Sequence, residues 1–99
     1  MMHQYLAEIY LPDEFSPEFM ALIPAQRAKI NHLLKEGTIR SYSLDMGRSK
    51  VWVVLVIESE EAAEELLEDF PVMPYCEYRI FELMFHDMAS HELPRISLN

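Results

Sequence analysis

The heptapeptide VWVVLVI, residues Val51–Ile57, decides how the rest of the chain must fold. All seven residues are apolar and five are β-branched, which favours a strand over a helix, and the run is too short to span a membrane. A strand directs alternate side chains to opposite faces, so both faces of this strand are apolar and both must be covered. The chain has helices enough for one face, and we predict that a second copy of the chain covers the other.

Length, charge and cysteine content restrict the class of protein. The 99 residues correspond to one domain, and the net charge of −9, from 17 acidic and 8 basic residues, disfavours binding to nucleic acid or to an anionic membrane. Cys76 is the single cysteine, so an intrachain disulfide is excluded and a reducing compartment is expected. The N-terminus lacks the basic and apolar regions of a signal peptide. We therefore expect a soluble cytoplasmic protein.

The first strand is expected over residues 3–11, and a helix follows it. Ser16-Pro17 begins this helix, because serine caps free backbone N–H groups and proline suits the first helical position. Gly37 provides the C-terminal stop. Pro24 interrupts the helical pattern, since a proline inside a helix removes a hydrogen bond. We expect either a kink near residues 20–23 or two short helices.

Three elements besides the heptapeptide, and one hairpin loop, complete the pattern. A hairpin loop over residues 45–50 precedes the heptapeptide, with Gly47 free to adopt a positive φ. Ser59 caps the second helix, whose glutamates form either an acidic docking surface or an ordinary solvated face. The predicted elements are a strand over residues 38–45, the heptapeptide strand, a helix over 60–69 and a strand over 76–86.

This order, β-α-β-β-α-β, predicts the ferredoxin-like fold of the α+β class. Right-handed crossovers place two helices on one face of a four-stranded antiparallel sheet and make the heptapeptide a central strand. The other face is left bare, and a bare apolar face of this size favours a symmetric homodimer. Residues 1–88 would form this domain. Residues 89–99 would be a C-terminal arm on a partner or a disordered tail.

Four segments occur in an order and spacing that resemble a known family: Glu36-Gly37-Thr38-Ile39-Arg40, Gly47-Arg48, Glu58-Ser59-Glu60-Glu61 and Phe70-Pro71-Val72-Met73-Pro74-Tyr75. Over most of residues 3–86 the chain resembles the muconolactone isomerase-like family of the dimeric α+β barrel group. The resemblance implies a barrel built from two sheets, sometimes assembled into larger rings. It also implies isomerisation of an unsaturated lactone by proton transfer, without a cofactor.

Such an isomerase needs a base, an acid and a cation. Glu8, on a mixed face of the first strand, would become a usable base if burial raised its pKa; otherwise it is a solvated carboxylate or a partner of Arg40. Arg40 can bind a carboxylate or form a surface ion pair. Tyr42 follows two residues later, so we expect both on the same side of the strand.

Other residues are weaker candidates for a functional role. His86 ends the last strand and serves either as a proton shuttle or as a surface histidine. Trp52 and Met73 could form the floor of a ligand pocket or simply pack in the core. Cys76 is expected to be a buried structural thiol. The four histidines lack metal-ligand spacing and the chain has only two glycines, so no metal site and no cofactor are expected.

Two functions remain open from the sequence. One is a cofactor-independent isomerase of a small lactone or organic acid, with Glu8, Arg40, Tyr42 and His86 as catalytic candidates and Arg40, Tyr42 and Trp52 as ligand-binding candidates. The other is a non-catalytic dimeric barrel that binds a small ligand or a partner protein. A polar cavity that holds Glu8, Arg40 and Tyr42 would favour the first function, and an apolar interior would favour the second.

Overall fold

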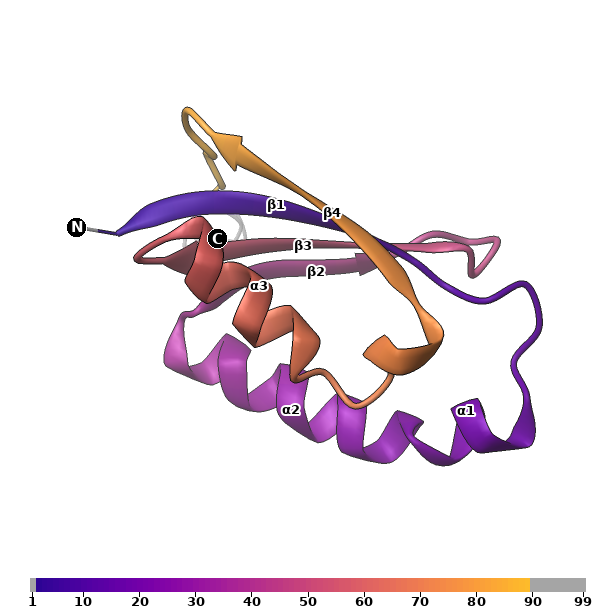
Figure 1. The fold of residues 1–99 in the computed structure, drawn as a ribbon. Helices are drawn as coiled ribbons and strands as arrows, with labels where there is room; N and C mark the ends of the chain where they lie inside the picture. The colour runs from indigo at the N-terminus through magenta and orange to yellow at the C-terminus, as the bar shows by residue number, and fades with distance from the viewer. Residues whose placement is uncertain (1, 90–99) are drawn as a thin grey trace, which may run out of the picture.

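The computed structural model describes residues 2–89, which form one antiparallel sheet with helices on one of its faces (Figure 1). The sheet has four strands in the order β2-β3-β1-β4, so the heptapeptide strand β3 is central, as predicted. This order and topology confirm the ferredoxin-like α+β fold. The elements are β1 (His3–Tyr10), α1 (Pro17–Ala21), α2 (Ile23–Glu36), β2 (Ile39–Leu44), β3 (Lys50–Ile57), α3 (Glu60–Glu68), a 3₁₀ helix (Met73–Tyr75) and β4 (Glu77–Leu83).

The core lies between the sheet and the helices. We call this side of the sheet the helix face. Its central residues come from β1 and β3, which pair antiparallel so that Ala7 lies opposite Val53 and Tyr5 opposite Leu55. These four side chains are at most 3% exposed. The helices contribute further large core side chains: Phe19, Ile30, Leu33 and Leu67. Burial of this apolar surface, at about 25 cal/mol per Å², holds the helices to the sheet.

The long predicted helix is divided into two at Leu22. Ser16 caps α1 as expected, since its Oγ accepts a hydrogen bond from the Phe19 N–H at 3.1 Å. The Leu22 N–H donates to the Phe19 carbonyl at 3.0 Å, and α2 begins at the next residue. Pro24 therefore lies in the first turn of a new helix, where its missing N–H costs no hydrogen bond. The two-helix alternative is confirmed, and the kinked helix was wrong.

The last strand is shorter than expected. Residues 76–86 were predicted to be extended, but β4 covers only Glu77–Leu83. Cys76 instead ends the 3₁₀ helix, because its N–H donates to the Met73 carbonyl at 2.9 Å. Phe85 and His86 lie beyond the strand. The predicted C-terminal arm lies outside the described residues, apart from Ala89.

The hairpin loop differs from the prediction in one residue. Arg48, and not Gly47, has the positive φ, at 59°. The Asp45 carboxylate explains the shape of the loop, because it accepts hydrogen bonds from the Ser49 and Lys50 N–H groups at 2.7 and 2.9 Å. These bonds also hold the pKa of Asp45 below its usual value. The loop is thus shaped by a side-chain bond that the glycine pattern did not reveal.

The opposite side of the sheet, which we call the open face, is also largely apolar. Leu6 lies opposite Val54 on β3 and opposite Phe81 on β4, so these three side chains form a row across the sheet. Within residues 2–89, all the helices lie on the other side (Figure 1). No helix in this range is long and apolar enough to cross a membrane. The open face is therefore the surface for which the sequence predicted a covering partner.

Gly37 and Gly47 allow a matched test of backbone conformation. Gly37 ends α2 at φ 85° and a Cβ there would meet no atom within 4 Å, so Gly37→Ala adds conformational strain without a clash. We expect a loss of roughly 1–2 kcal/mol in the free energy of unfolding. Gly47→Ala, where a Cβ would be 3.5 Å from Asp45 Oδ2, is the control and should change it by less than about 0.5 kcal/mol. Urea denaturation at one protein concentration measures both, and equal losses would contradict this account of Gly37.

Candidate functional site

A groove of about 380 Å³ lies on the helix face, between the helices α1 and α2 and the strands β2 and β3. We call it the helix–sheet groove. Most of its walls are apolar, and they include Phe15, Phe19, Ile23, Leu44 and Val51. Its polar groups are the side chains of Gln26, Arg27, Asn31 and Tyr42. An apolar groove with a few convergent polar groups is the usual form of a site for a small molecule.

Tyr42 is the sequence-predicted residue that lines this groove. It lies opposite Val53 in the β2–β3 pairing, which directs it to the helix face. Burial raises the pKa of the Tyr42 hydroxyl above its usual value, and Gln26 and Arg27 act in the opposite direction. Tyr42 is therefore a neutral phenol near pH 7, able to donate a hydrogen bond.

Gln26 is a groove residue that sequence reasoning missed. It is 6% exposed, and its Oε1 accepts a hydrogen bond from the Val72 N–H at 3.3 Å. The sequence did contain one signal for Gln26, because Gln26 is a polar residue on the apolar side of the expected helix. Its partner could not be inferred, because Val72 follows α3, 46 residues along the chain.

The groove lacks a group that could accept a proton near neutral pH. Among residues 2–89, its lining contains no aspartate, glutamate, histidine or cysteine. The phenol of Tyr42, with its raised pKa, and the guanidinium of Arg27 are donors under these conditions. The groove can therefore orient an anion or a carbonyl group, but it has no general base of its own.

A second polar group of residues lies on the open face, and Glu8 is at its centre. Glu8 accepts hydrogen bonds from the Tyr10 hydroxyl and from Trp52 Nε1, the latter at 3.1 Å. Arg79 lies opposite Glu8 in the β1–β4 pairing, and Lys50 Nζ is 5.8 Å from the Tyr10 ring centroid. We call Glu8, Tyr10, Trp52 and Arg79 the Glu8 cluster. It combines a carboxylate, a phenol and a guanidinium on one face of the sheet.

The pKa of Glu8 is lowered, so the alternative in which burial raises it does not hold in the single chain. Hydrogen bonds from Tyr10 and Trp52 hold the pKa below its usual value. These bonds stabilise the carboxylate, and their effect exceeds that of desolvation. Glu8 is therefore ionised near pH 7, available as a base but a weaker one than expected.

Arg40 and Tyr42 are not brought together in the groove. The pairing of β2 with β3 has an irregularity between Ile39 and Ser41, so strict alternation does not hold across Arg40. Arg40 is exposed, and its Nε donates to the Gly37 carbonyl at 3.3 Å. It does not line the groove, whereas Tyr42 does. The premise that both residues share one side of a regular strand was thus wrong.

The remaining candidates lie apart from the groove. Trp52 is on the open face with Glu8, and Met73 is buried in the core at 4% exposure. His86 follows β4, and its Nε2 is enclosed without a hydrogen-bond partner among the described residues. Burial raises the pKa of the Cys76 thiol to about 11, which keeps it protonated and unreactive near pH 7. The helix–sheet groove and the Glu8 cluster are therefore two sites on opposite faces of the sheet.

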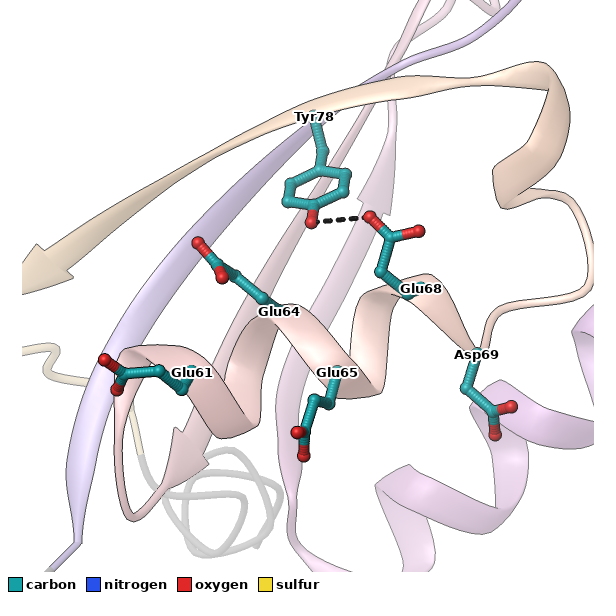
Figure 2. A pocket seen from close by; sticks show the side chains of 6 residues that line it. All are labelled: Glu61, Glu64, Glu65, Glu68, Asp69 and Tyr78. Carbon is teal, nitrogen blue, oxygen red and sulfur yellow. Dashed lines mark hydrogen bonds between the residues drawn. The ribbon is translucent and has the colours of Figure 1, made fainter.

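The acidic side of α3 borders a broad, open hollow of about 530 Å³ (Figure 2). Glu68 points toward Tyr78 of β4, and the Tyr78 hydroxyl donates to Glu68 Oε2 at 2.8 Å. Burial and Glu68 raise the pKa of Tyr78 to about 12. No group of three or more potential ligands in residues 2–89 is arranged to hold a metal ion. The other carboxylates are solvated, in agreement with the simpler of the two sequence interpretations.

Comparison with known proteins identifies the fold. No family model matches the sequence, and no curated protein matches it. A solved structure of muconolactone isomerase aligns with a TM-score of 0.69 and 23% sequence identity, over 89% of this chain and 95% of that one. An uncharacterised protein of Thermotoga maritima aligns with a TM-score of 0.55 and 9% identity, over 84% and 99%. The resemblance expected from the sequence is thus confirmed at the level of the fold.

Proposed function

We propose that this chain binds a small organic acid or lactone in the helix–sheet groove, without a cofactor. The observation that carries the proposal is the combination of apolar walls with the polar side chains of Arg27 and Tyr42 in a groove of about 380 Å³. Arg27 can pair with a carboxylate, and the neutral Tyr42 hydroxyl can donate to a carboxylate or carbonyl oxygen. The apolar walls would bury the hydrocarbon part of the ligand.

The groove supports binding more directly than catalysis. A proton shift requires a base within hydrogen-bond reach of the carbon that loses the proton. Within the part of the chain that the structure describes, the groove lining offers donors and apolar contacts but no such base. Among the functions considered, a non-catalytic barrel that binds a small ligand therefore agrees best with the groove.

Isomerisation is a second candidate, and the Glu8 cluster is the observation in its favour. Glu8 supplies an ionised carboxylate, Tyr10 a phenol and Arg79 a guanidinium within one patch of the open face. These are the base, acid and cation that a cofactor-independent proton shift needs. The fold that the chain shares with muconolactone isomerase adds to this candidate. It differs from the first in using the opposite face of the sheet.

A homodimer formed through the open faces agrees with both candidates. Leu6 and Phe81, which are partly exposed in the single chain, would be buried between two sheets beside Val54, which is already only 5% exposed. The Glu8 cluster would be enclosed with them. Assembly of such dimers into a larger ring stays a prediction. The cytoplasmic location expected from the single cysteine also stays a prediction.

Blocking the groove should abolish ligand binding. Leu44 is a groove residue at the exposed edge of β2, so Leu44→Trp should fill the entrance. We expect the affinity for small aromatic acids and lactones, measured by isothermal titration calorimetry, to fall by at least about tenfold, or 1.4 kcal/mol. Met46→Trp, at a hairpin residue outside the groove that is 99% exposed, is the control and should bind normally. Undiminished binding by Leu44→Trp would exclude the groove as the site.

A charge on the open face should dissociate the dimer. Phe81 is 43% exposed in the single chain, so Phe81→Glu leaves the fold intact but places a carboxylate within the proposed interface. Light scattering at micromolar concentration should give a dimer for the wild type and for Met46→Glu, and a monomer for Phe81→Glu. A monomeric wild type would refute the dimer.

Isomerisation at the Glu8 cluster should depend on the Glu8 carboxylate. Glu8→Gln should lower turnover of unsaturated lactones by at least about 100-fold, the usual contribution of a general base, whereas Glu58→Gln should not. Because the pKa of Glu8 is lowered, the active ionised form persists down to acidic pH. The rate should therefore be constant above the ordinary glutamate pKa of 4.5 and fall only below it. If the wild type converts none of the lactones, this candidate fails.

A further inference from the structure

One end of the helix–sheet groove is apolar on both walls. Figure 1 shows that α2 and β2 run in opposite directions, so the end of β2 lies beside the start of α2. Leu44, the last residue of β2, is therefore at the same end of the groove as Ile23, the first residue of α2. Val51 pairs with Leu44 across the β2–β3 ladder and belongs to this end as well. We call it the apolar end.

Two phenylalanines add aromatic surface to the apolar end. Phe15 precedes α1 and Phe19 lies within it, and their ring centroids are 4.6 Å apart. Phe19 and Val51 are 2% and 5% exposed, so they form the enclosed part of the lining. Leu44 is 53% exposed, which leaves apolar surface in water that the hydrocarbon part of a ligand would cover.

Polar groups follow on both walls. Arg27 and Asn31 come four and eight residues after Ile23, so the three side chains share one side of α2. They lie about 6 and 12 Å further along the helix axis. Tyr42, two residues before Leu44 on the same side of β2, is on the facing wall. We call Arg27, Asn31 and Tyr42 the polar band.

The polar band carries a positive charge. Within residues 2–89 the groove lining has no acidic side chain, and none of the ion pairs involves Arg27. Lys29, two residues further along α2, pairs instead with Asp69. The guanidinium of Arg27 is therefore available to a carboxylate from outside the chain, which it can bind through two parallel hydrogen bonds.

The apolar surface on the two sides of the polar band is unequal. After the band, α2 adds Leu34 to the lining, and this side chain is 40% exposed. Before the band lies the larger and better enclosed surface. A hydrocarbon chain whose head group lies at the polar band would therefore bury more apolar area by extending to the apolar end. That end is lined by Leu11, Phe15, Phe19, Ile23, Leu44 and Val51.

The volume of the groove limits the length of such a chain. A water molecule occupies about 30 Å³ of the liquid, and a carbon atom with its hydrogens is of similar size, so a groove of about 380 Å³ holds about a dozen non-hydrogen atoms. A carboxylate group accounts for its carbon and two oxygens. The rest of the ligand is then an apolar body of about nine carbons.

We propose that the ligand of the helix–sheet groove is an amphipathic monocarboxylic acid, whose carboxylate pairs with Arg27 and whose apolar body, of about nine carbons, extends to Phe15 and Phe19. Asn31 and Tyr42 can donate further hydrogen bonds to the carboxylate oxygens. This inference rests on the proposed function, since it names the ligand of the same groove and its orientation there.

A series of straight-chain acids tests the length of the ligand. Each methylene group buried at the apolar end should raise the affinity about two- to fourfold. In calorimetric titrations of the wild type, decanoate should therefore bind at least about tenfold more tightly than hexanoate, with octanoate between them. Dodecanoate exceeds the volume of the groove and should gain less than about twofold over decanoate.

Matched head groups test the role of Arg27. We expect the wild type to bind octanoate more tightly than 1-octanol, and octylammonium least. Arg27→Gln should lower the octanoate affinity at least about tenfold, because it removes a hydrogen-bonded charge pair. It should change the 1-octanol affinity by less than about twofold. Lys35→Gln removes the same charge from α2 at a residue outside the lining, and is the control.

Truncation at the apolar end tests the orientation. Phe15→Ala should lower the decanoate affinity at least about fivefold but leave hexanoate binding within about twofold, because the shorter acid does not reach Phe15. Phe85→Ala, at a 69% exposed residue outside the groove, is the control. Thermal denaturation monitored by circular dichroism shows whether Phe15→Ala folds. If it does not, Leu44→Ala, at an exposed residue of the apolar end, should lower decanoate affinity at least about twofold.

The outcomes separate this inference from the proposed function. Equal affinities for hexanoate and decanoate, or an octanoate affinity unchanged in Arg27→Gln, would refute the inference alone. So would a wild type that binds lactones but none of these acids. Decanoate binding that is lost in Phe81→Glu and kept in Phe15→Ala would place the acid on the open face and refute both. A wild type that binds neither acids nor lactones would also refute both.

Discussion

The position of β3 between β1 and β2 is the constraint on which the rest of the structure depends. This strand is apolar on both sides, so neither side can be left in water without a large cost in hydrophobic free energy. On the helix face, Val53 and Leu55 are fully buried under the helices. On the open face, Val54 is the centre of an apolar row. The helices cover one face of the sheet. The apolar character of the other face is the basis for the proposed dimer.

The alternation of side chains along the strands also separates the polar chemistry of the protein into two sites. Trp52 and Val53 are neighbours in the chain, yet Trp52 bonds to Glu8 on the open face while Val53 lies opposite Tyr42 on the helix face. The groove therefore holds hydrogen-bond donors, and the open face holds the carboxylate. The groups that can pair with an anion and the carboxylate that can accept a proton thus lie on different faces of the sheet. This separation is why the groove favours binding and why isomerisation would need the second face.

Local features of the sequence predicted the fold well. The caps at Ser16 and Ser59 and the strand character of the heptapeptide depend on residues within one turn or one strand, and the structure agrees with them. One wrong prediction came from applying the regular alternation of side chains to a strand that contains an irregularity. The break in the β2–β3 pairing removed the alternation that had joined Arg40 to Tyr42. For Glu8 the sequence left burial, solvation and a pair with Arg40 open, whereas its hydrogen-bond donors in the structure are Tyr10 and Trp52.

The sequence by itself determined the order of the elements and the central strand, because these follow from short-range periodicity and capping. Tertiary structure alone decided the two sites. Gln26 and Val72 are 46 residues apart, and Glu8 and Trp52 are 44 apart. Their hydrogen bonds form only when separate elements pack at a particular register and angle. No pattern within a single helix or strand specifies that packing. The hydrogen-bond partner of each polar side chain could therefore be identified only in the folded structure.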